Sequence, residues 1–409
     1  MTTGEALARA FADEWGRVVA ALVRTTGDWS LAEDAAQEAF ATAATAWERD
    51  GVPRRPGAWL TTVARNRALD RLRRGAVERS VLATRAAGMT EGGEVDPIEP
   101  DDVPDDRLRL IFTCCHPALG LEARVALTLR TLCGLSVEEI AHALGASEAA
   151  TAKRLVRAKQ KIQRAGIPYR VPSGAALPER LGAVLAVLYL LFTEGYAPSG
   201  GEAVVRPDLA AEAIRLTEVL ARLMPDEPEV LALLALERFQ DSRRDARTGP
   251  DGALVPLEEQ DRSRWSAPSI AAGEAALAAA ERLAARPGFQ LRQARIAALH
   301  ARARTTGRPD RAAIAAEYAA LRSLSASPHL ALAHAVAVGL ADGPDAGLAL
   351  LDGLPDAPLG AALPAARADL LRRADRRAEA AESYRRALGA VRSGPERAFL
   401  ERRLRETGG

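Results

Sequence analysis

Apolar residues recur three and four positions apart along most of the chain, the spacing that places them on one face of an α-helix. Near the N-terminus this spacing covers LAEDAAQEAFATAATAW and WLTTVARNRALDRLRR, which the loop DGVPRRPGA separates. Alternating runs rich in Val, Ile and Thr, which would indicate strands, are scarce. Ala, Leu and Arg abound, and aromatic residues make up only 4% of the chain, a composition that favours helices. The pattern predicts an all-α fold.

The length of 409 residues exceeds what one hydrophobic core needs and predicts several domains. We expect a first small helical domain over 5–85, a flexible acidic linker over 86–106 and a second small helical domain over 107–168. The linker is expected from EGGEVDPIEPDDVPDD, which holds eight acids, three prolines and no base. A helical extension over 172–270 and helical repeats over 271–405 are expected to follow.

The stretch 135–164 predicts a helix-turn-helix. Its first helix has apolar residues at i, i+3, i+4 and i+7, Gly145 ends that helix, and Ser147 caps the next one. The second helix presents two faces, an apolar one with Leu155, Ala158 and Ile162 and a basic one with Lys153, Arg157 and Lys161, flanked by Arg154. Such a helix suits the DNA major groove, where arginine pairs with guanine. The alternative is a solvated basic surface helix.

The formal net charge is only +1, but basic residues are concentrated in the two small domains. Residues 49–85 hold ten arginines against three acids, and residues 107–170 hold eleven arginines or lysines against four acids. A local excess of this kind is typical of surfaces that bind the phosphate backbone of nucleic acids. We therefore expect a nucleic-acid partner for this part of the chain.

The sequence contains no assembled catalytic or cofactor motif, so we expect no enzyme activity and no cofactor. Cys114, Cys115 and His116, with Cys133, raise a zinc hypothesis. Without a second paired ligand motif we favour buried cysteines and no metal. The N-terminus lacks the apolar stretch of a signal peptide, and the longest apolar run, 181–192, is about half of a membrane span. These features predict a cytoplasmic protein without membrane contact.

Three motifs and the acidic linker follow one another in the first 170 residues: DWSLAEDAAQEAFATAATAW, PGAWLTTVARNRALDRLRR and, after the linker, GLSVEEIAHALGASEAATAKRLVRAKQKI. In this order they resemble the two-domain core of extracytoplasmic-function sigma factors of the sigma-70 class. The resemblance implies that 5–85 is region 2, which binds core RNA polymerase and opens the minus-ten element. It implies that 107–168 is region 4, which recognises the minus-thirty-five element. The implied polymerase-binding residues are Asp34, Gln37, Glu38 and Phe40.

The resemblance also implies which residues contact promoter DNA. For the minus-ten element these are Trp59, Arg65, Asn66, Arg67, Asp70, Arg73 and Arg74, and the loop 50–57 with Asn66 would form the pocket for a flipped-out base. For the minus-thirty-five element they are Ser147, Thr151, Lys153, Arg154, Arg157 and Lys161. One departure is Ala152, where many relatives have Lys.

Two tryptophans flank the arginine-rich helix of the first domain, Trp47 and Trp59. Melting a promoter requires aromatic and amide groups that hold unstacked bases and cations that hold the displaced strand. The two indoles fit that need, and the alternative for each is a place in the hydrophobic core.

The C-terminal half contains four series spaced like a tetratricopeptide unit, with small or apolar residues four, three and five positions apart and a final Pro. They are Ala213, Thr217, Leu220 and Pro225; Ala275, Ala279, Arg282 and Pro287; Ala346, Leu350, Gly353 and Pro358; and Ala380, Tyr384 and Ala387, which lack the Pro. Together they predict a degenerate tetratricopeptide-like solenoid with a protein or peptide partner. An irregular helical bundle is the alternative.

Three further stretches resemble a sigma-factor subgroup that has a C-terminal tetratricopeptide-like extension: RLIFTCCHPAL, LYLLFTEGYAPSGG at 188–201 and DGALVPLEEQDRSRW at 251–265. The last two are expected to be contact surfaces toward the sigma domains or the polymerase, or else structured connectors.

Taken together, these features predict a sigma factor that binds core RNA polymerase and promoter DNA, with a C-terminal helical domain that regulates it in cis. A one-component helix-turn-helix regulator with a helical sensor domain would account for 135–164 and the repeats, but not for the polymerase-binding helix. A tetratricopeptide adaptor would account for the C-terminal half alone. We therefore favour the sigma factor.

Overall fold

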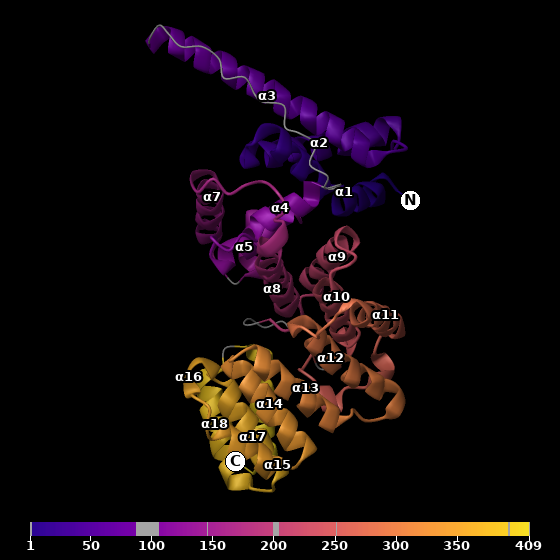
Figure 1. Cartoon of the computed structure of the whole chain (residues 1–409), viewed down its shortest axis with the longest axis vertical. Helices are drawn as coiled ribbons and strands as arrows, with labels where there is room; N and C mark the ends of the chain where they lie inside the picture. The colour runs from indigo at the N-terminus through magenta and orange to yellow at the C-terminus, as the bar shows by residue number, and fades with distance from the viewer. Residues whose placement is uncertain are drawn as a thin grey trace. The chain divides into compact units, whose positions relative to one another are not determined.

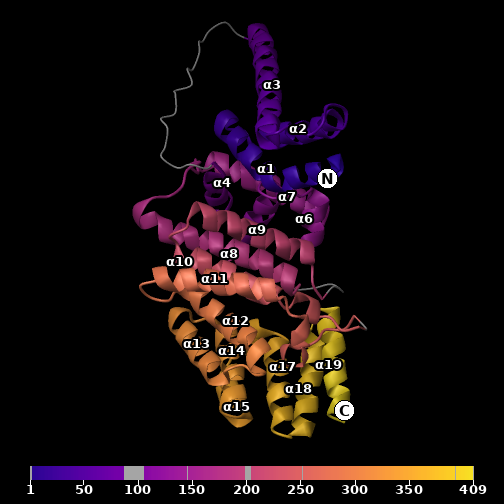
Figure 2. The ribbon, with the colours of Figure 1, turned by 90° about the vertical axis from the view of Figure 1, so that its right-hand side faces the viewer.

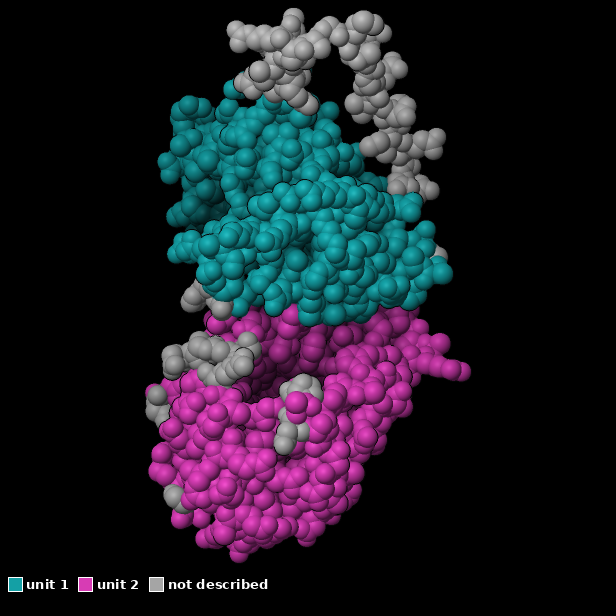
Figure 3. Space-filling model, turned by 90° about the vertical axis from the view of Figure 1, so that its left-hand side faces the viewer, with its two compact units in different colours: residues 1–187 teal, residues 188–409 magenta. Residues whose placement is uncertain are grey.

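The computed structural model describes residues 2–86, 106–144, 146–198, 204–250, 252–391 and 393–408. These residues form nineteen α-helices and no β-strand, and an isolated bridge joins Thr248 to Leu254. The all-α fold predicted from the apolar spacing is confirmed. The chain divides into two compact units, residues 1–187 and 188–409, which Figure 3 colours separately. Most of the expected acidic linker, 87–105, lies outside the described residues.

The N-terminal unit (residues 1–187) contains seven described helices and the first part of an eighth (Figure 1). They are α1 Thr3–Thr26, α2 Trp29–Asp50, α3 Pro56–Ala86, α4 Asp106–Cys114, α5 Leu121–Thr131, α6 Val137–Ala143, α7 Glu148–Arg164 and α8 Leu177–Tyr196, with a 3-10 turn at Gly174–Ala176. The division between the two units falls inside α8.

Helices α1, α2 and α3 each pack against the other two and form one bundle. Asp28 caps α2 by accepting hydrogen bonds from two backbone amides of its first turn. In the core, the ring of Phe11 stacks on Trp15 at 5.0 Å between centroids and meets Phe40 edge-on at 5.1 Å. The buried face of α2 is otherwise rich in alanine, which lets α1 and α3 approach its backbone closely.

Helices α4 to α7 form the second small domain, and α6 and α7 are its helix-turn-helix. Ser136 and Glu139 make a capping box at the start of α6. Ser147 caps α7 by accepting from the Ala150 amide, as predicted, whereas Gly145 lies outside the described residues. The predicted apolar face of α7 is also confirmed, since Leu155, Ala158 and Ile162 are buried.

The α1–α3 bundle and the α4–α7 domain pack directly against each other. The indole nitrogen Nε1 of Trp15 donates to the Thr131 carbonyl oxygen at 3.1 Å in a buried contact. Gly134 has a φ of +75° and no room for a side chain, because a Cβ there would lie 2.6 Å from Cζ of Phe11. The two domains, which the sequence suggested only as neighbours joined by a linker, therefore share one interface.

The C-terminal unit (residues 188–409) contains the end of α8 and eleven further helices among its described residues. They are α9 Pro207–Leu223, α10 Pro228–Asp241, α11 Ala267–Leu283, α12 Phe289–Thr306, α13 Arg311–Leu324, α14 Pro328–Ala341, α15 Pro344–Leu351, α16 Asp356–Leu359, α17 Ala362–Arg373, α18 Arg377–Ala390 and α19 Gly394–Glu406. Three 3-10 turns, Arg244–Ala246, Leu257–Glu259 and Arg262–Arg264, lie between α10 and α11. No described helix has both the length and the apolarity that crossing a membrane requires.

Most consecutive helices of this unit pack against each other, and α17, α18 and α19 lie side by side (Figure 2). Helices α14 and α15 approach most closely at two glycines, where a Cβ on Gly347 would lie 2.7 Å from the Cα of Gly339. Leu370 of α17 closes over the same crossing. Small residues therefore fix the spacing of this helix pair.

The tetratricopeptide spacing matches the buried positions in only part of this unit. Ala213, Thr217 and Leu220 are buried in α9, and the final series is buried in α18. In the second and third series, however, Ala275 and Leu350 are exposed, so the spacing does not mark a buried face there. Alanine is so frequent in these helices that its spacing alone does not determine which face is buried.

A carboxyl group is fully buried between α9 and α10. The Thr217 hydroxyl lies 3.0 Å from Oε1 of Glu237 and 3.1 Å from the Ala213 carbonyl oxygen. One hydroxyl proton cannot satisfy both acceptors, so the geometry fits a protonated Glu237 that donates to the hydroxyl, which in turn donates to the carbonyl. Burial raises the pKa of Glu237 well above its ordinary value of 4.5.

We predict that Glu237→Gln removes a pH-dependent loss of stability. Because the folded-state pKa is raised, the native protein holds a proton that the unfolded chain releases, and stability falls as pH rises above about 4.5, by up to about 1.4 kcal/mol per pH unit. The amide is neutral at every pH, so the variant should unfold at a higher temperature than wild type at pH 8 and near the same temperature at pH 4.

Calorimetry of the full chain across this pH range provides the measurement. Glu218→Gln is the matched control, because Glu218 is partly exposed and pairs with Arg238. Equal pH profiles for wild type and Glu237→Gln would show that Glu237 is charged in the native protein.

Candidate functional site

The outer face of α2 presents the polar residues expected to bind polymerase. Asp34 and Gln37 are exposed and Glu38 is half-buried. Arg71 of α3 pairs with both carboxylates, at 3.1 Å from Oδ2 of Asp34 and in contact with Glu38. Burial lowers the pKa of Arg71, but the two ion pairs outweigh it and raise that pKa overall. Phe40 lies on the opposite, buried face of α2, so it positions the helix from inside.

A cleft of about 630 Å³ lies at the start of α3. Arg55, Pro56 and Gly57 line one part of it, Asn66 of α3 lines another, and Glu14 of α1 completes the wall. Of the loop 50–57, which the sequence grouped with Asn66 as one pocket, only residues 55–57 border this cleft together with Asn66. The contribution of Glu14 from α1 was not predicted from the sequence.

The two tryptophans beside α3 differ in their exposure. Trp47 is only 2% exposed and belongs to the core, whereas Trp59 is half-buried. Their rings meet edge-on at 5.8 Å between centroids. The core alternative therefore holds for Trp47, and Trp59 remains accessible beside the cleft residues.

The remaining residues expected at the minus-ten element lie on exposed positions of α3: Arg65, Asn66, Arg67, Asp70, Arg73 and Arg74. Arg73 lies 3.8 Å from Asp70 in an exposed pair, which contributes little to stability. The surface of α3 therefore offers a row of cations next to the cleft.

Helix α7 presents its basic face as the sequence predicted, with Lys153, Arg157 and Lys161 exposed. Arg154 is half-buried and pairs with Glu122 of α5 at 2.5 Å. Thr151 is fully buried, so its side chain is not available to a base in this arrangement. Ser147 is exposed and already accepts the capping hydrogen bond.

A buried carboxylate joins the two small domains. Glu33 of α2 is 3% exposed and receives three donors from the other domain. Nε of Arg130 lies 3.1 Å from its Oε2, the Thr131 hydroxyl lies 3.2 Å from its Oε1, and Nζ of Lys159 lies 3.0 Å from its Oε2. The two cations come from α5 and from α7, so one side chain of α2 holds both helices.

A groove of about 400 Å³ runs beside this contact between α2 and α7. Ser30, Glu33 and Asp34 line it from α2, and Lys159 and Gln163 line it from α7. Asp34, an expected polymerase-binding residue, therefore faces the helix that is expected to bind DNA.

The cysteine cluster is part of the core of the second domain. Cys114, Cys115 and Cys133 are all buried and form no disulfide. Burial raises the pKa of the Cys115 thiol to about 11, so it stays protonated at neutral pH. Burial also lowers the pKa of His116. The described residues contain no group of His, Cys, Asp and Glu side chains arranged to hold a metal ion.

Comparisons with known proteins place these two domains in sequence families. Residues 11–77 match sigma-70 region 2, and residues 109–162 match sigma-70 region 4. Residues 180–281 match a family of unknown function, DUF6596. The ECF RNA polymerase sigma factor SigL of Mycobacterium tuberculosis is 35% identical over 155 residues, which cover 37% of this chain and 83% of SigL. The chain belongs to the ECF sigma factor family.

Two other relatives differ in how much of this sigma factor they cover. An uncharacterised protein of Rhizobium meliloti is 40% identical over 397 residues, covering 95% of this chain and 92% of that protein. The protein named "Probable ECF RNA polymerase sigma factor SigI" of Mycobacterium tuberculosis is 32% identical over 147 residues, covering 35% of this chain and 50% of SigI. No solved structure matches the chain.

The family matches show which parts of the sigma factor the buried carboxylate of Glu33 connects. Glu33 lies within the region 2 match, and Arg130, Thr131 and Lys159 lie within the region 4 match. The contact therefore joins region 2 to region 4 of one sigma factor. Sequence reasoning missed Glu33, although it lies four residues after Trp29 and seven before Phe40, where an acid on an apolar stripe is unusual.

We predict that Glu33→Ala lowers the free energy of unfolding by about 3 kcal/mol, since it leaves two partly buried cations without their carboxylate. The matched control is Glu38→Ala, which removes a half-buried carboxylate from the same helix, paired with Arg71 in an ion pair open to solvent, and should cost under about 1 kcal/mol. Urea unfolding of the full chain, followed by circular dichroism, measures both. Equal losses in the two variants would contradict a stabilising role for Glu33.

Proposed function

We propose that this sigma factor binds core polymerase through α2, opens the minus-ten element with α3 and its cleft, and recognises the minus-thirty-five element with α7. We propose further that its C-terminal unit regulates these steps in cis. The observation that supports the promoter roles most strongly is the cleft at the start of α3. It joins an amide, Asn66, to a basic loop and lies next to an exposed row of arginines.

A flipped-out base needs a concave site with hydrogen-bonding groups, and the neighbouring strand needs cations. The side-chain amide of Asn66 offers a donor and an acceptor to the edge of a base. Arg55 at the rim and Arg65 on α3 supply positive charge for the phosphates. These features support the proposal that the cleft takes a base of the minus-ten element.

For the minus-thirty-five element, the proposal is that the exposed cations of α7 enter the major groove. Arg157 is free to approach a base edge because its side chain is exposed. Arg154 must first exchange its pairing with Glu122. We therefore propose Arg157, Lys153 and Lys161 as the primary contacts and Arg154 as a contact formed on binding.

The packing of region 4 beside Asp34 supports a second proposal, that regions 2 and 4 separate when core polymerase is bound. Asp34 lines the groove between α2 and α7, and a polymerase surface that contacts Asp34 needs that space. Lys159 also belongs to the DNA-binding helix and is held by Glu33. Free and engaged sigma factor would thus differ in this interface.

A one-component transcription regulator remains the second candidate, since it would also use the helix-turn-helix. The region 2 match over 11–77 favours the sigma factor, because a regulator of that kind needs no polymerase-binding helix. The two functions differ in one test, as only a sigma factor gives core polymerase alone the ability to start at a promoter.

Regulation in cis is proposed because a sigma factor core does not need the C-terminal unit. SigL is covered over 83% of its length by only 37% of this chain. The C-terminal unit has its own hydrophobic cores. For its packed helices we propose a degenerate tetratricopeptide-like arrangement. A helical array of this type offers an extended surface for a protein or peptide.

We predict that reversing Asp34 and Glu38 to Lys abolishes core-dependent run-off transcription by weakening core binding. The matched control is Arg71→Gln, which removes their intramolecular partner and leaves both carboxylates in place. This control should bind core polymerase as well as wild type or better. Wild-type binding by the double reversal, or loss of binding in Arg71→Gln, would show that this face of α2 does not dock on polymerase.

We predict that truncation after Pro198, which keeps α8 complete, changes the run-off rate severalfold. Deletion of α19 alone should reproduce part of this change, because it removes the final helix that packs on α18. Circular dichroism of the truncated protein checks that the sigma regions remain folded. Regulation in cis is rejected if the truncated protein initiates at the full-length rate.

A further inference from the structure

A cavity of about 500 Å³ lies in the C-terminal unit, within the range of about 300–1,000 Å³ that small-molecule sites occupy. One wall is apolar and consists of Ile314 and Tyr318 of α13 with Leu332, Val336 and Leu340 of α14. The promoter and polymerase functions proposed above do not use this cavity.

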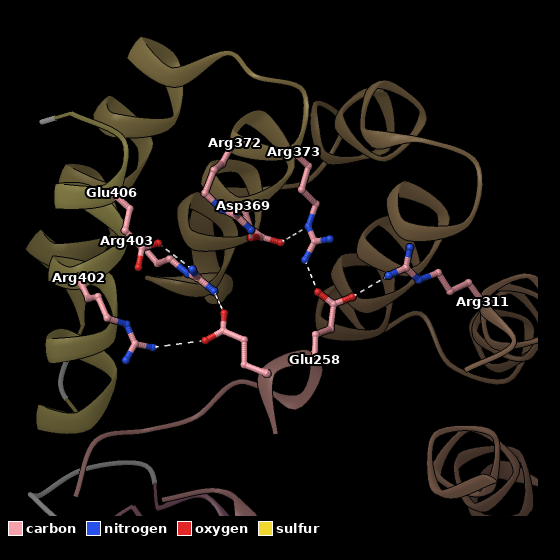
Figure 4. A network of polar contacts seen from close by, with 9 residues as sticks. Glu258, Arg311, Asp369, Arg372, Arg373, Arg402, Arg403 and Glu406 are labelled. Carbon is pink, nitrogen blue, oxygen red and sulfur yellow. Dashed lines mark hydrogen bonds and ion pairs between the residues drawn. The ribbon is translucent and has the colours of Figure 1, made fainter. Parts of the chain in front are cut away.

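Another part of the lining is charged and includes residues of a segment that we call the acidic strap, residues 256–261. Figure 4 shows Glu258 of the strap between two arginines, Arg311 of α13 and Arg373 of α17. Nη2 of Arg311 lies 3.0 Å from Oε1 of Glu258, and Arg373 contacts the other oxygen. Glu259 contacts Arg403 of α19 in the same way. The strap thus supplies carboxylates to arginines from three different helices.

The side chain of Glu258 can leave its arginines without the strap unfolding. The chain around the strap is fixed by backbone hydrogen bonds, from the Val255 amide to the Arg247 carbonyl and from the Ser266 amide to the Ser242 carbonyl. The Glu258 side chain itself is 43% exposed. Exposed ion pairs of this kind exchange at little cost. Glu258 therefore behaves as an internal counter-ion that another carboxylate can replace.

Several donors on the cavity wall have no acceptor. Trp265 is 3% exposed, and its Nε1 has no hydrogen-bond partner among the described residues. Nε of Arg262 and Nε of Arg403 are buried and unpaired as well. Four arginines and three carboxylates line the cavity, and burial lowers the pKa of His300 to about 4, so this histidine is neutral. The lining therefore favours an occupant with acceptor oxygens and negative charge.

We propose that this cavity binds an organic carboxylate with an apolar body. The carboxylate takes the place of Glu258 between Arg311 and Arg373, and the apolar body lies against α13 and α14. Arginine presents two parallel donors to a carboxylate, which suits this exchange. The proposal does not rest on the promoter function, because its test measures binding alone.

Two probes test the proposal on the full chain by calorimetric titration: decanoate, used below its micelle concentration, and 2-naphthoate. The neutral 2-naphthamide keeps the ring and lacks the charge. We expect at least one carboxylate to bind more tightly than about 1 mM and the amide to bind at least about tenfold more weakly, as expected for loss of a charge-assisted hydrogen bond.

Three variants distinguish binding at this site from non-specific binding of the probes. Glu258→Gln removes the internal counter-ion and should tighten carboxylate binding about fivefold or more, a gain that a misfolded protein cannot produce. Arg373→Gln should weaken it about tenfold. The control is Arg302→Gln, which breaks a bidentate pair with Glu274 on α12 and α11, away from the cavity, and should leave the affinity unchanged.

The outcomes are distinct. Failure of both carboxylates to bind, or equal affinity in wild type and Glu258→Gln, overturns the proposal. A synthetic hexapeptide with the strap sequence PLEEQD is the third arm. If this peptide binds Glu258→Gln with dependence on Arg373 while both small carboxylates fail, the cavity is a peptide site and the proposal is wrong.

Discussion

The arrangement of the sigma regions depends on one buried carboxylate, that of Glu33. A charge at 3% exposure is tolerated in a folded protein only when charged and polar partners replace the lost water. All three partners come from region 4, through Arg130, Thr131 and Lys159. Burial of the Glu33 carboxylate is therefore favourable only while region 4 supplies its partners. The same contact places α7, proposed to bind DNA, and the face of α2 proposed to bind polymerase along one groove.

The sequence predicted local features well and the interface poorly. The Ser147 cap and the buried face of α7 follow from spacings of a few residues, and the structure has both. Glu33 and Arg130 are 97 residues apart, and no local pattern relates them. Thr151 was assigned to DNA from a family resemblance, yet its side chain is buried. The pattern within one helix determines which residues share a face. Whether a residue is buried also depends on which distant segment of the chain packs against that face.

In the C-terminal unit, too, the sequence predicts the helices better than it predicts which of their residues are buried. Its helices could be predicted because alanine, leucine and arginine favour helix, but the tetratricopeptide spacing includes two exposed residues, Ala275 and Leu350. Alanine occupies both buried and exposed faces, so the core there is decided by larger neighbours such as Leu277 and Leu348. No local pattern predicted the partners of the strap carboxylates. Their arginines come from helices that begin about fifty residues and more further along the chain.

We have proposed that region 4 leaves region 2 when core polymerase and promoter are engaged. Spin labels at Thr45→Cys in α2 and Arg164→Cys in α7 test it directly, since both positions are exposed and the native cysteines are buried. Double electron–electron resonance should give one narrow distance distribution for the free protein and a longer distance in the complex with core polymerase and promoter DNA. An unchanged distance in that complex would show that regions 2 and 4 stay together on the polymerase, contrary to the proposal.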